Sequence, residues 1–476
     1  METESAWKKY GESDLAELER IAREYMDFIS ENKIEREFAR AAVAQAEAAG
    51  YRNIEDVYAA GETLSAGDKV YAITHGKAVM MVQLGTEPIE HGMNILGAHI
   101  DSPRLDIKQN PLFERSDLLH LDTHYYGGIK HYQWVTLPLA LHGVFAKKDG
   151  SVVNVNVGED EGDPVFCVSD LLIHLAKDQM QKKASEVVNG EDLDVLVGSR
   201  PLVVAEEDAK KDDADKTELE KLAAKEPVKA YALKLLAEKY GVEEADFLSA
   251  EIEVVPAGRA RELGFDRSMI IGYGQDDSAC AWPSLAAQLA VDAPVRTTVT
   301  LLVDKEEIGS VGASGMASQF FENTVEMLME LAGEGGGVHA RRAMAASRML
   351  SSDVSAGLDP AYASVFEPKN ASYIGRGLVF NKFTGSRGKS GSNDADAEFV
   401  ALVRRIMDDA GVIYQTAELG KVDIGGGGTI AYLPAKYGMD VIDSGVSVLS
   451  MHAPWEVTSK ADIYEAYKGY VAFLRS

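Results

Sequence analysis

Two consecutive glutamates, Glu306 and Glu307, lie between an apolar run, 299–303, and a glycine-rich segment, 309–315. This pattern predicts a buried strand that ends in a tight polar turn. Neighbouring side chains at the end of a strand point in different directions, so one glutamate can hold a cation while the other accepts a proton. A metal-dependent hydrolase needs this division of roles. The alternative is that both acids belong to a solvated charged turn.

A histidine and an aspartate, His99 and Asp101, stand at the end of a second apolar segment, 93–100. Residues two apart on a strand share a face, so His99 can bind a metal ion while Asp101 accepts the other imidazole N–H and fixes the tautomer. For this pair taken alone, the alternative is a histidine that packs in the core or lies at the surface.

Three further candidates, Asp276, Asp353 and His452, lie where a strand or helix is expected to begin or end. Ligands of open α/β sheets collect at the carboxyl ends of the strands, so these residues can meet although they are far apart in sequence. Two histidines and three carboxylates, one of them bridging, form the ligand set of a two-zinc or zinc–manganese site, and one carboxylate remains as a base. Asp277 is the alternative bridge. The sequence contains neither the G-x-S-x-G motif of serine hydrolases nor an HExxH motif.

Hydrophobic periodicity defines the elements that must position these residues. Helical spacing of apolar residues predicts helices over 13–49, 279–290, 315–331 and 459–474. Short apolar runs predict strands over 93–100 and 296–303 and a hairpin over 69–74 and 78–84. Strands and helices alternate near both ends of the chain, which predicts a three-layer α/β domain. The intervening segment, 104–249, is rich in strand-like runs and is predicted to be a separate inserted domain.

Length and composition limit the possible functions. A chain of 476 residues exceeds what one core usually supports, so two domains are expected. Lys and Arg number 48 against 76 Asp and Glu, and the net charge of −28 argues against nucleic acid or an anionic membrane as a partner. The two cysteines are far apart, and the sequence shows no signal peptide or long apolar span. A cytoplasmic protein is therefore expected.

The combination of motifs resembles the aspartyl aminopeptidase family of metallopeptidases, particularly its bacterial branch. The matching segments, in chain order, are GAHIDSPRLDIK, YYGGIKHYQW, GYGQDDSACAW, VDKEEIGSVGASG, SSDVSAGLDP, GSRGKSGSNDADAEF, ELGKVDIGGGGTIA and SMHAPWEVTSKADIYEAYKGYVAF. This resemblance covers nearly the whole chain. It implies a three-layer α/β/α zinc-aminopeptidase-like catalytic domain over 1–103 and 250–476, with an inserted β-rich dimerisation domain over 104–249.

The resemblance also implies which residues hold the metal ions. His99 and Asp353 would bind one divalent ion, Glu307 and His452 would bind the other, and Asp276 would bridge the two. Zinc is the metal that it implies, and manganese and cobalt are the alternatives.

Further roles concern catalysis and the substrate. By resemblance, Glu306 is the general base, Asp101 orients the first metal-binding histidine, and His174 approaches the active site of a neighbouring subunit in a tetrahedral homododecamer. Lys382 is a candidate for contacting an acidic substrate side chain, with a solvated loop charge as the alternative. Gly427, in a run of four glycines, is a candidate for close approach of a peptide backbone, with a tight turn as the alternative.

The expected function is the removal of N-terminal residues from peptides by a metal-activated water. A preference for acidic residues stays open, because the segments after Asp353 and over 384–393 differ from the pattern of eukaryotic members. Another two-metal amidohydrolase on the same core, a carboxypeptidase or deacylase, is the closest alternative. An assembly shell that binds cargo without catalysis is a second alternative, against which the complete set of candidate ligands argues.

Overall fold

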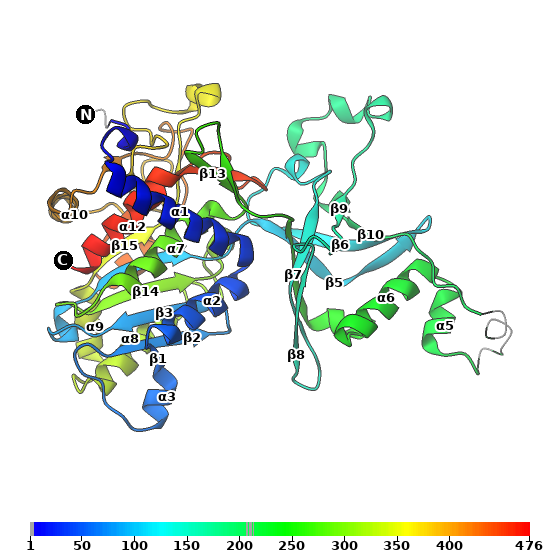
Figure 1. Ribbon diagram of the computed structural model, residues 1–476, viewed down its shortest axis with the longest axis horizontal. Helices are drawn as coiled ribbons and strands as arrows, with labels where there is room; N and C mark the ends of the chain where they lie inside the picture. The colour runs from blue at the N-terminus through cyan, green and yellow to red at the C-terminus, as the bar shows by residue number, and fades with distance from the viewer. Residues whose placement is uncertain (1–3, 206–207, 209–211, 213) are drawn as a thin grey trace. The chain divides into compact units, whose positions relative to one another are not determined.

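The computed structural model describes residues 4–205, 208, 212 and 214–476. The chain divides into two compact units, one formed by 1–102 and 259–476 and the other by 103–258. The first unit is thus built from both ends of the chain, and Figure 1 shows N-terminal and C-terminal helices side by side within it. The expected boundary at residue 249 differs from the observed one. Strand β11 (Ala250–Pro256) pairs with strands of the second unit, so the insertion continues to residue 258.

A nine-stranded sheet runs through the first unit in the order β1-β2-β3-β14-β4-β15-β19-β17-β18. Its central strands β14, β4, β15 and β19 are parallel, whereas β3 and β17 run antiparallel to their inner neighbours. The strands are β1 (Arg52–Asn53), β2 (Lys69–Thr74), β3 (Ala78–Gln83), β4 (Asn94–His99), β14 (Thr298–Val303), β15 (Arg348–Ser352), β17 (Leu378–Asn381), β18 (Tyr414–Thr416) and β19 (Asp440–Gly445). The predicted hairpin and the two predicted strands are confirmed as β2–β3, β4 and β14.

Helices cover both faces of this sheet, which confirms the three-layer prediction (Figure 1). Successive strand side chains point to opposite faces, so in β4 Ile95 joins one hydrophobic core and Leu96 the other. The helices of one face are α1 (Glu12–Glu31), α2 (Glu35–Ala48), α7 (Gln275–Ala290), α10 (Ala397–Asp409) and α12 (Lys460–Leu474). Those of the other face are α3 (Ile54–Ala59), α8 (Phe320–Leu331), α9 (Val338–Ala345) and α11 (Tyr432–Ala435).

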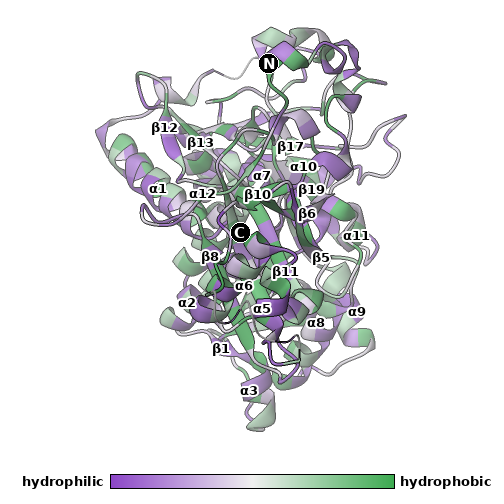
Figure 2. Ribbon diagram, turned by 90° about the vertical axis from the view of Figure 1, so that its right-hand side faces the viewer, coloured by the Kyte–Doolittle hydropathy of each residue, from purple (hydrophilic) through white to green (hydrophobic). Residues whose placement is uncertain are grey.

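The helices follow the sequence pattern with two differences. Figure 2 shows hydrophilic and hydrophobic residues alternating along α1, as an amphipathic helix requires. The single helix expected over 13–49 is interrupted between α1 and α2, where the Asn32 side chain donates to the Phe28 carbonyl and Glu37 accepts the N–H of Lys33. The helix expected from Gly315 begins only at Phe320, because Gly315 packs tightly against the backbone of the preceding turn.

The second unit contains a seven-stranded antiparallel sheet in the order β8-β7-β11-β5-β6-β10-β9. The additional strands are β5 (Arg104–Arg115), β6 (Leu118–Tyr126), β7 (Leu139–Ala146), β8 (Val152–Val157), β9 (Cys167–Val168) and β10 (Val195–Gly198). Helices α5 (Glu218–Ala223) and α6 (Pro227–Tyr240) accompany this sheet. The expected β-rich insertion is therefore confirmed.

The first unit also contains two small sheets. One contains β12 (Arg261–Leu263), β13 (Met269–Gly272) and β21 (Glu456–Ser459), and the other contains β16 (Ser355–Ala356) and β20 (Ser447–Val448). Pairing of β13 with β21 joins the chain just before α7 to the chain just before α12. Among the described residues, no helix is long and apolar enough to cross a membrane.

Candidate metal centre

Three neighbouring parallel strands, β14, β4 and β15, end at the same edge of the sheet. His99 is the last residue of β4 and lies opposite Val303, the last residue of β14. Glu306 and Glu307 follow β14 within a few residues, and Asp353 directly follows β15. The fold therefore brings residues from three distant parts of the sequence to one edge, as expected for a ligand site of an α/β sheet.

The imidazole of His99 is buried and has a defined orientation. Its Nδ1 lies 3.0 Å from the main-chain oxygen of Asp101 and 3.4 Å from the Asp101 carboxylate. A carbonyl oxygen only accepts hydrogen bonds, so Nδ1 carries a proton, and Nε2 is the nitrogen that would bind a cation. The sequence predicts that the Asp101 carboxylate fixes this tautomer, but in the structure the closer contact is to its main chain.

The Asp101 carboxylate contacts the glutamate pair instead. Its two oxygens accept the backbone N–H groups of Glu306, at 3.1 Å, and Glu307, at 3.2 Å. These N–H groups begin a short 3₁₀ helix, Glu306–Ile308, and would otherwise lack partners. Asp101 therefore aligns the histidine through its main chain and both glutamates through its side chain.

Asp276 and His452 come from segments beside the sheet edge. Asp276 lies in the first turn of α7, where it and Asp277 have non-helical backbone angles. His452 lies in the turn before β21 and has a positive φ of 63°. Both residues therefore have irregular backbone conformations, which let their side chains reach the ligands at the strand ends.

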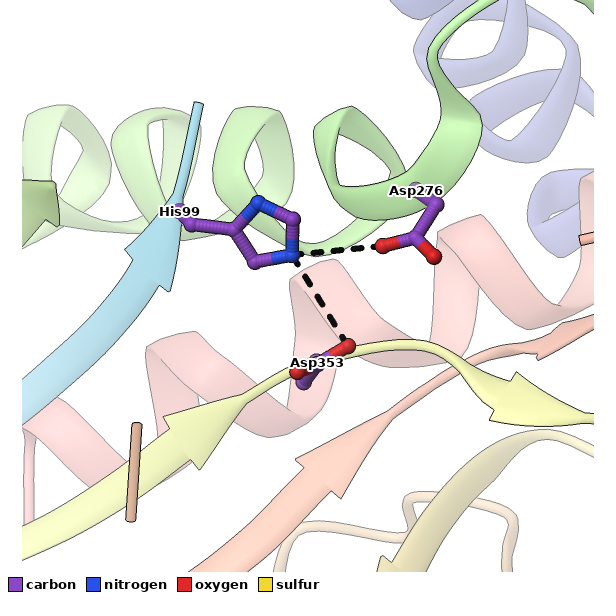
Figure 3. Close-up of side chains that lie close together, drawn as sticks. All are labelled: His99, Asp276 and Asp353. Atoms are coloured by element: carbon purple, nitrogen blue, oxygen red, sulfur yellow. Dashed lines mark ion pairs between the residues drawn. The ribbon is translucent and has the colours of Figure 1, made fainter. Parts of the chain in front are cut away.

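The five predicted ligands form two groups around Asp276. Figure 3 shows the first group, in which His99 Nε2 lies 3.2 Å from Asp276 Oδ1 and 4.0 Å from Asp353 Oδ1. In the second group, His452 Nε2 lies 3.2 Å from Asp276 Oδ2 and 3.6 Å from Glu307 Oε2. The ligand atoms within each group all lie within 4.8 Å of one another. Asp276 is thus shared, with one oxygen directed to each histidine.

Burial and crowding strongly perturb these carboxyl groups. Burial, together with the neighbouring Asp276 carboxylate, raises the pKa of Glu307 and of Asp353 well above the usual range. Burial also raises the pKa of Glu306 to about 6, where His99 opposes the shift and Asp276 adds to it. Although burial opposes it, contact with His452 and His99 lowers the pKa of Asp276. Several acids are crowded where a positive charge would offset their repulsion.

The residues of both groups fit divalent cations. Asp276 Oδ1 and Glu307 Oε1 are buried without a hydrogen bond, although a buried carboxylate oxygen left in that state is costly. Histidine nitrogens and carboxylate oxygens are ligands that zinc, manganese and cobalt all accept. Asp277 is also buried with unbonded oxygens but is in neither group, so the geometry favours Asp276 as the shared ligand.

Two side chains that sequence analysis did not single out contact the backbone of these ligands. The Ser102 hydroxyl donates to the Asp276 carbonyl at 2.7 Å. Glu456 accepts the N–H of Asp276 and the N–H of His452. Neither residue has a motif of its own, and only its position beside a ligand segment in the sequence could have suggested it.

The three predicted substrate residues lie outside both groups of ligands. His174 is exposed in a 3₁₀ turn, Ile173–Leu175, of the inserted unit. Lys382 pairs with Asp394, which also accepts Lys389.

The glycine run divides into residues with and without space for a side chain. A Cβ at Gly425 or Gly426 would collide with the backbone of a neighbouring loop, whereas at Gly427 it would only contact the Leu419 side chain. Close backbone packing therefore requires glycine at the first two positions of the run, and Gly427 is free of that constraint.

A three-layer α/β/α domain whose strand ends carry two histidine–carboxylate groups around one aspartate is typical of metal-dependent hydrolases with two ions. The comparisons agree with this class. A family model described as "Aminopeptidase I zinc metalloprotease (M18)" matches residues 28–474, and the chain belongs to this family.

Similar proteins match this chain over its whole length. A probable M18 family aminopeptidase 1 of Clostridium acetobutylicum is 57% identical over 475 residues, which cover 100% of this chain and 98% of that protein. The crystal structure of an M18 aminopeptidase from Thermotoga maritima has a TM-score of 0.91 at 40% identity and covers 100% of this chain and 99% of its own. The yeast mApe1 dodecamer has a TM-score of 0.73 at 20% identity, covering 95% and 96% respectively, and shows that the fold is shared.

Proposed function

We propose that this chain is an aminopeptidase with two metal ions, most suitably zinc, that removes N-terminal residues from peptides. The observation that carries the proposal is the pair of ligand groups that share Asp276, in a chain of the M18 family. His99 and Asp353 would hold one ion, and Glu307 and His452 the other. Such ions, when bound, would supply Lewis-acid polarisation of a peptide carbonyl and would lower the pKa of a bound water molecule.

Glu306 is the residue that moves protons. It belongs to neither ligand group, its backbone is anchored by Asp101, and its raised pKa of about 6 suits a base that works near neutral pH. Its carboxylate takes a proton from the attacking water and returns it to the nitrogen of the leaving peptide. Asp101 acts through others, because it holds the imidazole of His99 and both glutamates in place.

Substrate recognition is assigned to two further residues. Lys382 and Lys389 share the single carboxylate of Asp394, so one positive charge of this exposed trio is not neutralised. We assign Lys382 to an acidic side chain or to a terminal carboxylate of the substrate. Gly427 lies beside the loop that carries Lys382 and Lys389, because its N–H donates to the main-chain oxygen of Thr384 in that loop. It therefore offers the substrate a backbone without a side chain.

Assembly into a homo-oligomer, a tetrahedral dodecamer by resemblance, forms the second part of the proposal. The inserted unit exposes Leu172, Ile173 and Leu175 to 53%, 65% and 68%, and these apolar side chains surround His174. A stretch of this kind is suited to burial against a second subunit. His174 would then contribute to the site of its neighbour. Both cysteines are free, in keeping with a reducing cytoplasm.

Metal analysis combined with a substrate panel tests this function. The full chain is stripped with a chelator, reloaded with zinc, manganese or cobalt, and assayed on aminoacyl amides with a free or an acetylated α-amine. We expect two metal ions per chain and turnover only with the free amine. Turnover of the acetylated amides would indicate a deacylase or related amidohydrolase, and a chain that binds no metal would refute the proposal.

A further inference from the structure

Glu456 connects two metal-ligand segments that are 176 residues apart in sequence. It is 1% exposed and is the first residue of β21. Its Oε2 accepts the backbone N–H of Asp276 at 3.0 Å, and its Oε1 accepts the backbone N–H of His452 at 2.7 Å. We propose that Glu456 is a positioning residue that fixes the spacing between these two ligands, an inference that rests on the proposed function.

Both segments need such support, because neither belongs to a regular element at the ligand itself. Asp276 has φ −86° and ψ 102°, outside the helical region, and Asp277 after it is also non-helical, although both lie in the first turn of α7. His452 has φ 63° and Ser450 has φ 58°, a region that non-glycine residues adopt at a cost in energy. One carboxylate that accepts an N–H from each segment stabilises both conformations together.

Additional hydrogen bonds restrict the same peptide groups. The Gln275 side chain donates to the main-chain oxygen of Glu456 at 2.5 Å, so the residue before Asp276 holds the backbone of Glu456 in return. On the other side, the Ser102 hydroxyl donates to the Asp276 carbonyl at 2.7 Å. Glu456, in β21, and Ser102, in the segment after β4, therefore both hold the Asp276 peptide. Asp276 cannot shift without breaking these hydrogen bonds.

The chemistry requires a carboxylate at this position. A glutamate side chain offers one acceptor oxygen to each of the two N–H groups, as the two hydrogen bonds show. A glutamine would direct its NH₂ group at one of them, and that N–H group would then be displaced. Because Asp276 is shared, the displacement affects the His99 group as well as the His452 group.

The test compares Glu456→Gln with a matched control, Asp462→Asn. Asp462 is also fully buried and also accepts two backbone N–H groups, from Gly375 at 2.8 Å and Gly377 at 2.7 Å, but it contacts no proposed ligand. Each full-length chain is freed of metal and titrated with Co²⁺ in competition with a chelator, and its visible absorption spectrum and melting temperature are recorded. We expect Glu456→Gln to weaken Co²⁺ binding about 10- to 100-fold and to alter the spectrum, the usual scale for outer-shell partners.

The control separates positioning from stability. Asp462→Asn is expected to lower the melting temperature while Co²⁺ affinity and spectrum remain those of the wild type. If Glu456→Gln binds Co²⁺ with wild-type affinity and spectrum, the inference is wrong, even if its melting temperature falls. If Glu456→Gln does not fold, Glu456→Asp keeps both oxygens on a shorter stem, and undiminished Co²⁺ affinity in that variant would equally overturn it. A wild-type chain that binds no Co²⁺ overturns the proposed function itself.

Discussion

Replacing Glu306 with glutamine should remove catalysis while leaving the metal centre intact. Glu306 is in neither ligand group, and its backbone N–H, rather than its side chain, is bound by Asp101. Glutamine has nearly the same shape, so the turn that carries Glu307 is expected to remain in place. The variant tests the assignment of one glutamate to proton transfer and its neighbour to a metal ion.

The size of the effect follows from the role of the base. With a pKa of about 6, Glu306 is a carboxylate in about nine-tenths of molecules at pH 7, so the substitution removes the form that predominates. Loss of a general base usually costs a factor of about 10² to 10⁴ in rate, or about 3–5 kcal/mol in the activation barrier. Bound cations favour the carboxylate, so in the wild type kcat should fall with acid at a midpoint no higher than about 6.

Single-turnover and steady-state rates on an aminoacyl amide, with metal content measured on the same samples, check this prediction. Glu307→Gln is the matched control, and it is expected to lose metal as well as activity. If Glu306→Gln instead loses metal while Glu307→Gln retains it, the two roles are reversed. A Glu306→Gln protein with a wild-type rate and full metal content would refute the role of Glu306 as the base.

The remaining predictions concern the bridge, assembly and specificity. Asp276→Ala should retain less than about one-tenth of the wild-type metal content, because the substitution removes a ligand from both groups. Asp277→Ala should keep two ions. The reverse result would identify Asp277 as the bridge. His174→Phe should sediment as the wild-type oligomer but lose activity at least about tenfold. The control is His91→Phe, at an exposed histidine, which should not affect activity. A fully active His174→Phe protein would contradict the shared site. Lys382→Ala should raise KM for Asp and Glu amides about tenfold, about 1.4 kcal/mol, with little change for Leu amides; equal changes for both would exclude it from specificity.

Sequence patterns were sufficient for strands β2, β3, β4 and β14 of the central sheet, but they did not predict its strand β15. Hydrophobic runs of strand length located β4 and β14, and the polar residues directly after them became the candidate ligands. This succeeds because a buried strand must be apolar along its length, so a His or Glu at its end stands out. The start of α8 and the break between α1 and α2 were not predicted, since they depend on a packed glycine turn and on side-chain caps.

The sequence by itself determined the chemistry of the site, because residue type decides which atoms can bind a cation or take a proton. It also located the insertion to within nine residues, 249 against 258, since strand-like runs differ visibly from the α/β pattern around them. Only the tertiary structure places Asp276 between the two histidines and Asp277 in neither ligand group, because neighbouring aspartates look equivalent in a sequence and differ only in the direction of their side chains. The same holds for the contacts of Glu456, because pairing of β21 with β13 brings its carboxylate to two peptide groups that are distant in sequence. Long-range contacts of this kind depend on how strands pair, and local patterns carry no information about that.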